Sequence, residues 1–134
     1  MKEVLIALVL FVATTSSYGA DYDCGDKTPG ARIDCVEKLA ERADAELKRV
    51  FGKAIAYINS KDNAHLSKED RESWRAAALN SQRSWEAYRQ TECNTVTPYL
   101  WGTGSGVTAA ISECELERTR DRIRELKQTY SITK

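Results

Sequence analysis

Residues 28–63, TPGARIDCVEKLAERADAELKRVFGKAIAYINSKDN, decide the fold. Apolar side chains recur there every three or four positions over several turns, which predicts one face of a long amphipathic helix. These side chains are Ile33, Val36, Leu39, Ala40, Ala43, Leu47, Val50, Phe51, Ala54 and Ile58. Thr28 suits the N-cap and Pro29 the first turn, where no amide donor is missed. The turn formers of residues 59–63 end the pattern.

A second helix is expected to open at Ser67, where Asp70 follows three residues later as in a capping box. One face of this helix carries Trp74, Ala78, Leu79, Ser81, Trp85, Tyr88 and Glu92. We expect it to end near Cys93, because Pro98 disfavours helical continuation past Thr97.

A glycine-containing loop is expected over residues 94–106, with Ser105 as the cap of a third helix. One face of that helix carries Ile111, Glu115, Thr119, Arg122, Ile123, Leu126 and Tyr130. Consecutive helices with short connections pack most simply side by side in alternating directions. The expected fold class is therefore all-α, an antiparallel three-helix bundle stapled by two disulfides.

Residues 1–20 have the features of a signal peptide: a lysine, an apolar run over residues 4–14, and small residues before a cleavage point after Gly19 or Ala20. The run is too short for a membrane span, which needs about 20 apolar residues. We therefore expect a soluble secreted or periplasmic protein with no stable membrane anchoring. Residues 21–134 are expected to form a single domain.

Four cysteines follow this leader, at Cys24, Cys35, Cys93 and Cys114. An even number of cysteines in a short exported chain indicates disulfides. We expect Cys24 to pair with Cys35, tying the N-terminal segment to the first helix, and Cys93 to pair with Cys114 across the glycine-containing loop. Four cysteines allow three connectivities, and the sequence leaves the other two open.

The charge balance and the scarcity of reactive side chains argue against several function classes. Twenty basic residues balance 20 acidic ones, whereas nucleic-acid binding and anionic-membrane binding both favour a basic excess. His65, the single histidine, has no partner histidines for a zinc site or a catalytic triad. We expect no catalytic residue, no metal and no cofactor, and therefore no enzyme.

Tyr99, Leu100, Trp101 and Gly102 are the candidate partner-binding residues. Tyrosine and tryptophan anchor protein interfaces, and these two lie outside the helical pattern. The alternative is a lid that folds back over the end of the bundle and completes the core. A third possibility for the whole chain, a small-ligand carrier, would need a large internal pocket.

Trp85, Arg89, Glu92 and Arg122 form a second candidate cluster. We interpret it as a structural network, with a core tryptophan, an Arg89–Glu92 ion pair near the disulfide, and Arg122 joining from the third helix, because buried arginines need partners. The alternative is a ligand cleft. An acidic row is interpreted as a solvated helix face rather than a docking surface for a basic partner, because basic residues interleave with it. The row consists of Glu113, Glu117, Asp121 and Glu125.

The pattern Gln82-x-x-Trp85-x-x-Tyr88-Arg89-x-x-Glu92-Cys93 resembles the central signature of the LprI-like lysozyme-inhibitor domain family, small exported bacterial helical domains. The pattern Cys114-x4-Thr119-x2-Arg122-x3-Leu126 is similar to the family's C-terminal signature, and Gly104-Ser105 precedes it as a glycine–serine element does in the family. Lys48 and Thr103 depart from the family pattern, in place of an asparagine and a glycine.

The resemblance implies a helical fold, export, and a protein partner such as lysozyme or a related cell-wall hydrolase. The alternative is a periplasmic structural or interaction module for another envelope partner, without hydrolase inhibition. The sequence does not indicate the oligomeric state.

Overall fold

The computed structural model describes residues 24–25, 27–104 and 106–133; the expected signal peptide, residues 1–20, and the expected cap Ser105 lie outside this part of the chain. The described residues form helices and contain no strand. The elements are α1 (Pro29–Ile58), a 3-10 turn η1 (Lys61–Asn63), α2 (Lys68–Thr91), a π-helical turn η2 (Glu92–Val96), α3 (Thr97–Trp101) and α4 (Gly106–Thr129). The all-helical class expected from the sequence is confirmed.

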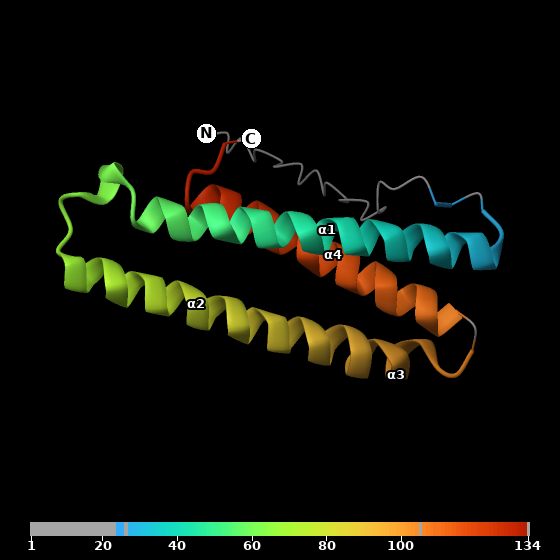
Figure 1. Ribbon diagram of the computed structural model, residues 1–134. Helices are drawn as coiled ribbons and strands as arrows, with labels where there is room; N and C mark the ends of the chain where they lie inside the picture. The colour runs from blue at the N-terminus through green and yellow to red at the C-terminus, as the bar shows by residue number, and fades with distance from the viewer. Residues whose placement is uncertain (1–23, 26, 105, 134) are drawn as a thin grey trace, which may run out of the picture.

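The chain turns back after α1 at η1 and again after α3, which places α1, α2 and α4 alongside one another (Figure 1). α1 packs most closely against α4 and much less closely against α2. Lys127 of α4 donates a hydrogen bond to Glu46 of α1 at 2.7 Å, and this bond lowers the pKa of the Glu46 carboxyl below its ordinary value.

The turns that separate the long helices are built from short-range hydrogen bonds. Asn63 is buried in η1, and its side-chain amide donates to the Tyr57 carbonyl at 2.7 Å, which closes the turn after α1. Ser67 then caps α2, because its Oγ accepts the Asp70 amide hydrogen at 3.0 Å. This is the capping interaction that the sequence predicts at this point.

The apolar core consists of two clusters along the molecule. The larger cluster lies towards the η1 end and contains Leu47, Val50, Ala54, Ile58, Ala78, Ile123, Leu126 and Tyr130. The smaller cluster surrounds the first disulfide and contains Cys24, Val36, Ala43 and Leu116. The periodic apolar face of residues 28–63 supplies members of both clusters, so α1 contributes side chains to both parts of the core.

A polar contact lies between the two clusters and joins the three long helices. Arg89 of α2 donates from Nη1 to Asp44 Oδ1 of α1 at 2.5 Å and to Thr119 Oγ1 of α4 at 2.6 Å. Thr119 is 1% exposed, so its hydroxyl has little access to water. We call Asp44, Arg89 and Thr119 the Arg89 clamp.

The end of α2 differs from the expectation. The sequence predicts a helix end near Cys93 and a loop over residues 94–106, but helical structure continues through η2 and α3 to Trp101. In η2 the Thr97 amide bonds to the Glu92 carbonyl five residues back, which widens the turn just before Pro98. Pro98 then occupies the first turn of a new helix, where its missing amide hydrogen breaks no bond.

Two disulfides staple these elements, and they are the expected pairs. Cys24 bonds to Cys35, and Cys93 in η2 bonds to Cys114 in α4, with Cα–Cα distances of 6.0 and 5.5 Å. Cys93 is fully buried, so the second disulfide fixes η2 against α4 inside the structure.

Replacing Cys93 and Cys114 together by alanine should lower the free energy of unfolding by about 3 kcal/mol, because this bond closes a loop of intermediate length. For a domain of this size that corresponds to a fall in melting temperature of at least about 10 °C. Thermal unfolding of the oxidised proteins, followed by circular dichroism, measures the difference. An unchanged melting temperature would contradict the stabilising role.

Replacing Arg89 by methionine should lower the free energy of unfolding by about 1.5–3 kcal/mol, because charged hydrogen bonds are lost and the buried Thr119 hydroxyl loses its donor. Urea unfolding measures the loss. The matched control is Arg118→Met, which removes a more exposed arginine paired with Glu92 at the longer distance of 3.8 Å and should cost no more than about 1 kcal/mol. Equal losses of unfolding free energy for the two variants would show that the Arg89 clamp stabilises the fold no more than the Arg118–Glu92 pair does.

Candidate functional site

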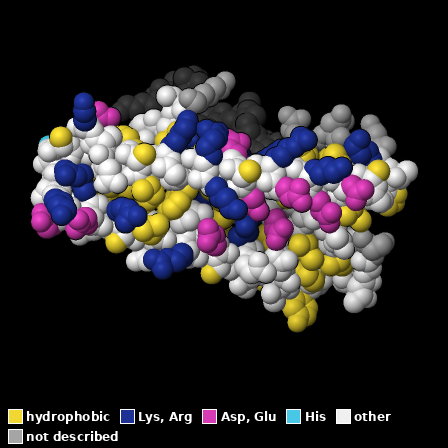
Figure 2. Space-filling model, viewed as in Figure 1, with side chains coloured by type: hydrophobic (Ala, Val, Ile, Leu, Met, Phe, Trp, Pro, Cys, Tyr) yellow, Lys and Arg dark blue, Asp and Glu magenta, His cyan; other side chains and the backbone are white. Residues whose placement is uncertain are grey.

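The most exposed apolar side chains of the described residues lie on α3. Tyr99, Leu100 and Trp101 are 86%, 79% and 63% exposed. We call these three residues the α3 knob. Figure 2 shows hydrophobic side chains protruding from the end of the molecule where α3 lies. The alternative of a lid folded back over the core is wrong for these side chains, because they project into solvent.

The other large hydrophobic side chains classed as exposed lie close to the knob in sequence. Among the described residues, the other large hydrophobic side chains that are exposed are Tyr88 and Val96, which precede the knob on α2 and η2. Contiguous exposed apolar side chains on a small protein mark an interaction site more often than isolated ones do. Tyrosine and tryptophan are also the side chains that contribute most often to binding hot spots.

The base of the knob is fixed on both sides. On its N-terminal side, η2 is tied to α4 through the Cys93–Cys114 disulfide. On its C-terminal side, Gly102 adopts φ +75°, a left-handed conformation that favours glycine, and its amide donates to the Pro98 carbonyl at 2.9 Å. The knob is therefore a short, closed helical turn rather than the loop expected from the sequence.

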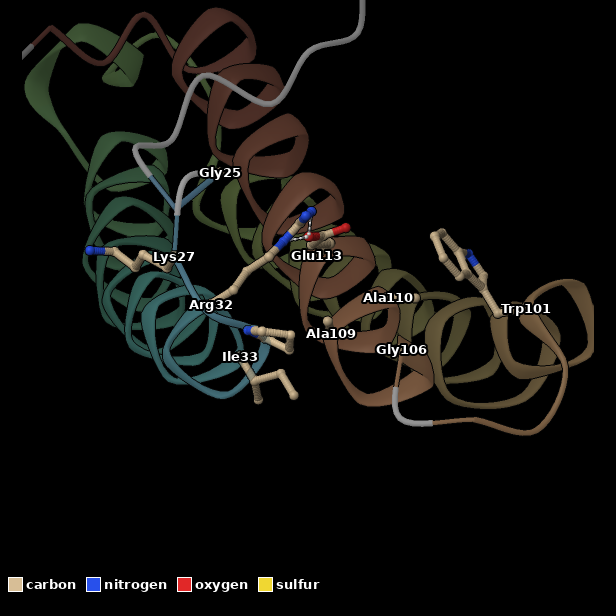
Figure 3. A pocket seen from close by; sticks show the side chains of 10 residues that line it. Gly25, Lys27, Arg32, Ile33, Trp101, Gly106, Ala109, Ala110 and Glu113 are labelled. Carbon is tan, nitrogen blue, oxygen red and sulfur yellow. Dashed lines mark hydrogen bonds and ion pairs between the residues drawn. The ribbon is translucent and has the colours of Figure 1, made fainter.

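A recess of about 260 Å³ lies beside Trp101, between the start of α1 and the start of α4. Figure 3 shows Trp101 on one side of it and Arg32 and Glu113 directed toward one another on the other side. The Arg32 guanidinium donates to Glu113 Oε1 from Nη2 at 2.5 Å and from Nε at 3.2 Å. This pair balances the charge on that wall, while Ile33 and Ala109 give the recess an apolar part.

Three of the four residues of the expected network do come together. The Trp85 ring has the Arg89 guanidinium 5.0 Å and the Arg122 guanidinium 6.0 Å from its centroid. Arg122 is buried and donates to Gln82 Oε1 at 3.2 Å, to Ser81 Oγ at 3.1 Å and to Glu125 at 2.8 Å. The two arginines therefore have polar partners as well as an aromatic face, which supports a structural role for this cluster.

Glu92 departs from the expectation. Its carboxylate lies 3.8 Å from Arg118 of α4, whereas Arg89 bonds to Asp44 and Thr119. The expected Arg89–Glu92 pair is thus replaced by two interhelical pairs. The reason is geometric, because Arg89 extends toward α1 while Glu92 belongs to the wider η2 turn beside α4.

The acidic row of α4 is engaged with neighbouring cations at three of its positions. Glu113 bonds to Arg32, Asp121 to Arg124, and Glu125 to Arg122. This pairing fits a solvated, internally balanced helix face. It gives no concentrated negative field with which to attract a basic partner.

The described part of the chain holds no group of three or more histidine, cysteine or acidic side chains placed to bind a metal ion. His65 is exposed in the connection between η1 and α2. The exposed side chains of the α3 knob offer an apolar, aromatic contact surface.

Comparison with protein-family models matches residues 24–126 to the family described as lysozyme inhibitor LprI. No curated protein and no solved structure matches the chain. Within the described residues, no helix combines the length and the hydrophobicity needed to cross a membrane. The family match includes both disulfides, the Arg89 clamp and the α3 knob, and it covers most of the sequence. The chain therefore belongs to the LprI lysozyme-inhibitor family.

Proposed function

We propose that this protein binds and inhibits lysozyme or a related cell-wall hydrolase, and that the α3 knob is its contact surface. The observation that carries the proposal is the exposure of Tyr99, Leu100 and Trp101 on one fixed helical turn. The family description supports a protein partner of this kind.

We also propose that the protein is exported. Residues 1–20 act as the signal peptide, and residues 21–134 form a single domain in the cell envelope or outside the cell. Two disulfides support this setting, because such bonds persist in oxidising compartments. In this proposal α1, α2 and α4 form an antiparallel three-helix bundle that carries the knob at one end.

The knob suits the blocking of an enzyme cleft. Tyrosine and tryptophan offer large contact areas with few rotatable bonds, so little conformational entropy is lost when they are immobilised. The fixed base of α3 lowers that cost further, because the backbone needs no ordering on binding. The absence of net charge on the chain implies weak electrostatic steering, so the association rate should depend little on salt.

A second candidate function uses the same surface. In it the knob docks onto another envelope protein and no hydrolase is inhibited. The balanced charge of the chain favours this candidate, since an inhibitor of a basic enzyme gains from an acidic surface.

Trp101→Ala should weaken inhibition at least tenfold and leave the helical circular-dichroism signal unchanged, because Trp101 is exposed and contributes little to the core. The measurement is lysis of bacterial cell walls by a panel of lysozyme types with increasing amounts of the oxidised protein. Arg75→Ala, an exposed position on α2 far along the chain from α3, is the matched control and should inhibit like the unmodified protein.

Two results would contradict the proposal. Full inhibition by Trp101→Ala would remove the knob from the mechanism. No inhibition by the unmodified protein, at large excess over every lysozyme, would favour the second candidate function, docking onto another envelope protein. If the unmodified chain then captured one stable envelope protein that Trp101→Ala did not capture, that protein would be the partner.

A further inference from the structure

A groove of about 420 Å³ runs between α1 and α2, separate from the α3 knob. Residues from Asp44 to Phe51 form its α1 wall, and residues from Leu79 to Arg89 form its α2 wall. Its volume falls within the range of small-molecule sites, about 300–1,000 Å³. Figure 2 shows hydrophobic side chains at the surface between α1 and α2, with Lys and Arg side chains around them.

Two members of the Arg89 clamp, Asp44 and Arg89, line one end of the groove. At this end α2 is joined to α1 by a long guanidinium side chain, whereas nearer η1 the two helices meet through apolar and aromatic side chains. α1 and α2 pack much less closely than α1 and α4 do. The groove lies where this looser packing leaves space between the two helices.

The floor of the groove combines three apolar side chains with the buried amide side chain of Gln82. Leu47 is buried, and Phe51 and Leu79 are half-buried, so each presents part of its side chain to the groove. Covering this surface would bring a hydrophobic gain proportional to the area removed from water. A ligand for this site therefore needs an apolar portion.

Two of the three cationic side chains that line the groove have no carboxylate partner. Arg89 and Asp44 neutralise one another, and Glu86 accepts a hydrogen bond at 3.2 Å from the neutral Gln82 amide, so the lining holds three cationic and two acidic side chains. Lys48 and Arg83 take part in no ion pair among the residues that the structure describes.

Lys48 and Arg83 come from opposite walls, Lys48 from α1 and Arg83 from α2. Arg83 is held on its own helix by a hydrogen bond from Nη2 to Asn80 Oδ1 at 3.0 Å, which leaves its other donors available. An anionic head group at the groove can therefore receive charged hydrogen bonds from both walls.

The length of the groove limits the size of the whole ligand, head group included, because polar side chains line the end of both walls at Asp44 and Arg89. At 1.5 Å per residue, the α1 and α2 walls extend roughly 10 and 15 Å. An extended alkyl chain with carbon–carbon bonds of about 1.5 Å advances roughly 1.25 Å per carbon, so roughly eight to twelve carbons match these walls.

We propose that the α1–α2 groove binds a free single-chain amphiphile with a carboxylate head, such as a medium-chain fatty acid. The apolar chain lies on Leu47, Phe51 and Leu79, and the carboxylate bonds to Lys48 and Arg83. A partner helix fits less well, because helix-in-groove binding uses a row of about four anchors, and the floor offers three apolar side chains.

The test is calorimetric titration of the oxidised protein with decanoate, decanol and decyltrimethylammonium, all below their aggregation concentrations. Decanoate should bind one to one and at least tenfold more tightly than the neutral and cationic compounds. The double variant Lys48→Glu with Arg83→Glu should lose at least tenfold in decanoate affinity. Lys38→Glu, a charge reversal at an exposed α1 position outside the groove, should bind decanoate normally.

Several outcomes would overturn the proposal. No decanoate binding would remove the site, and equal binding of the three compounds would show that the carboxylate is not recognised. Unchanged binding by the double variant would place the site elsewhere. Binding only to vesicles of anionic phospholipid would replace the free amphiphile by a membrane surface. Trp101→Ala should bind decanoate normally, which separates this site from the knob and from the proposed inhibition.

Discussion

The hydrogen bonds of Arg89 to Asp44 and Thr119 are the contact on which the arrangement of the long helices depends. A single guanidinium joins α2 to both α1 and α4 at the level where the apolar core is interrupted. Arg89 is half-buried, and its guanidinium is satisfied by partners on both neighbouring helices, which favours this position of α2. Arg89 and Asp44 line one end of the α1–α2 groove, and the Cys93–Cys114 disulfide fixes η2, from which α3 follows, against α4.

The two ends of the molecule have different physical characters. At the η1 end, the rings of Tyr57, Trp74 and Tyr130 pack together with centroids 6.1 to 6.2 Å apart, and they close the larger core cluster. At the α3 end, aromatic side chains face solvent instead, on a turn fixed by a disulfide and by Gly102. Aromatic side chains thus stabilise the fold at one end and remain free for a partner at the other.

Much of the fold follows from local sequence patterns. The spacing of apolar residues over residues 28–63 predicts α1, and Ser67 predicts the start of α2. Thr119 and Arg122 fall on the apolar face of the third helix by the same reasoning, and the structure buries both. The helical content could be predicted because each helix carries its own periodicity and, in α2, its own cap.

The features that sequence reasoning missed depend on contacts distant in the chain. Pro98 is a valid stop signal for an ideal α-helix, but the π-helical turn before it creates a new helix start, which no local rule anticipates. The partner of Arg89 was missed because Asp44 and Glu92 are both carboxylates within plausible reach, and the rotation of α2 about its axis decides between them. The sequence does contain one indication of the Arg89–Asp44 pair. Asp44 lies next to the apolar face of α1, where an acidic residue needs a partner.

Hydrogen–deuterium exchange of the oxidised protein, with and without a lysozyme that it inhibits, tests the central role of the α3 knob most directly. The account predicts that amides of residues 96–104 exchange more slowly in the complex, while those of η1 and the start of α2, at the opposite end in Figure 1, are unchanged. Slower exchange at the η1 end with none at residues 96–104 would contradict it.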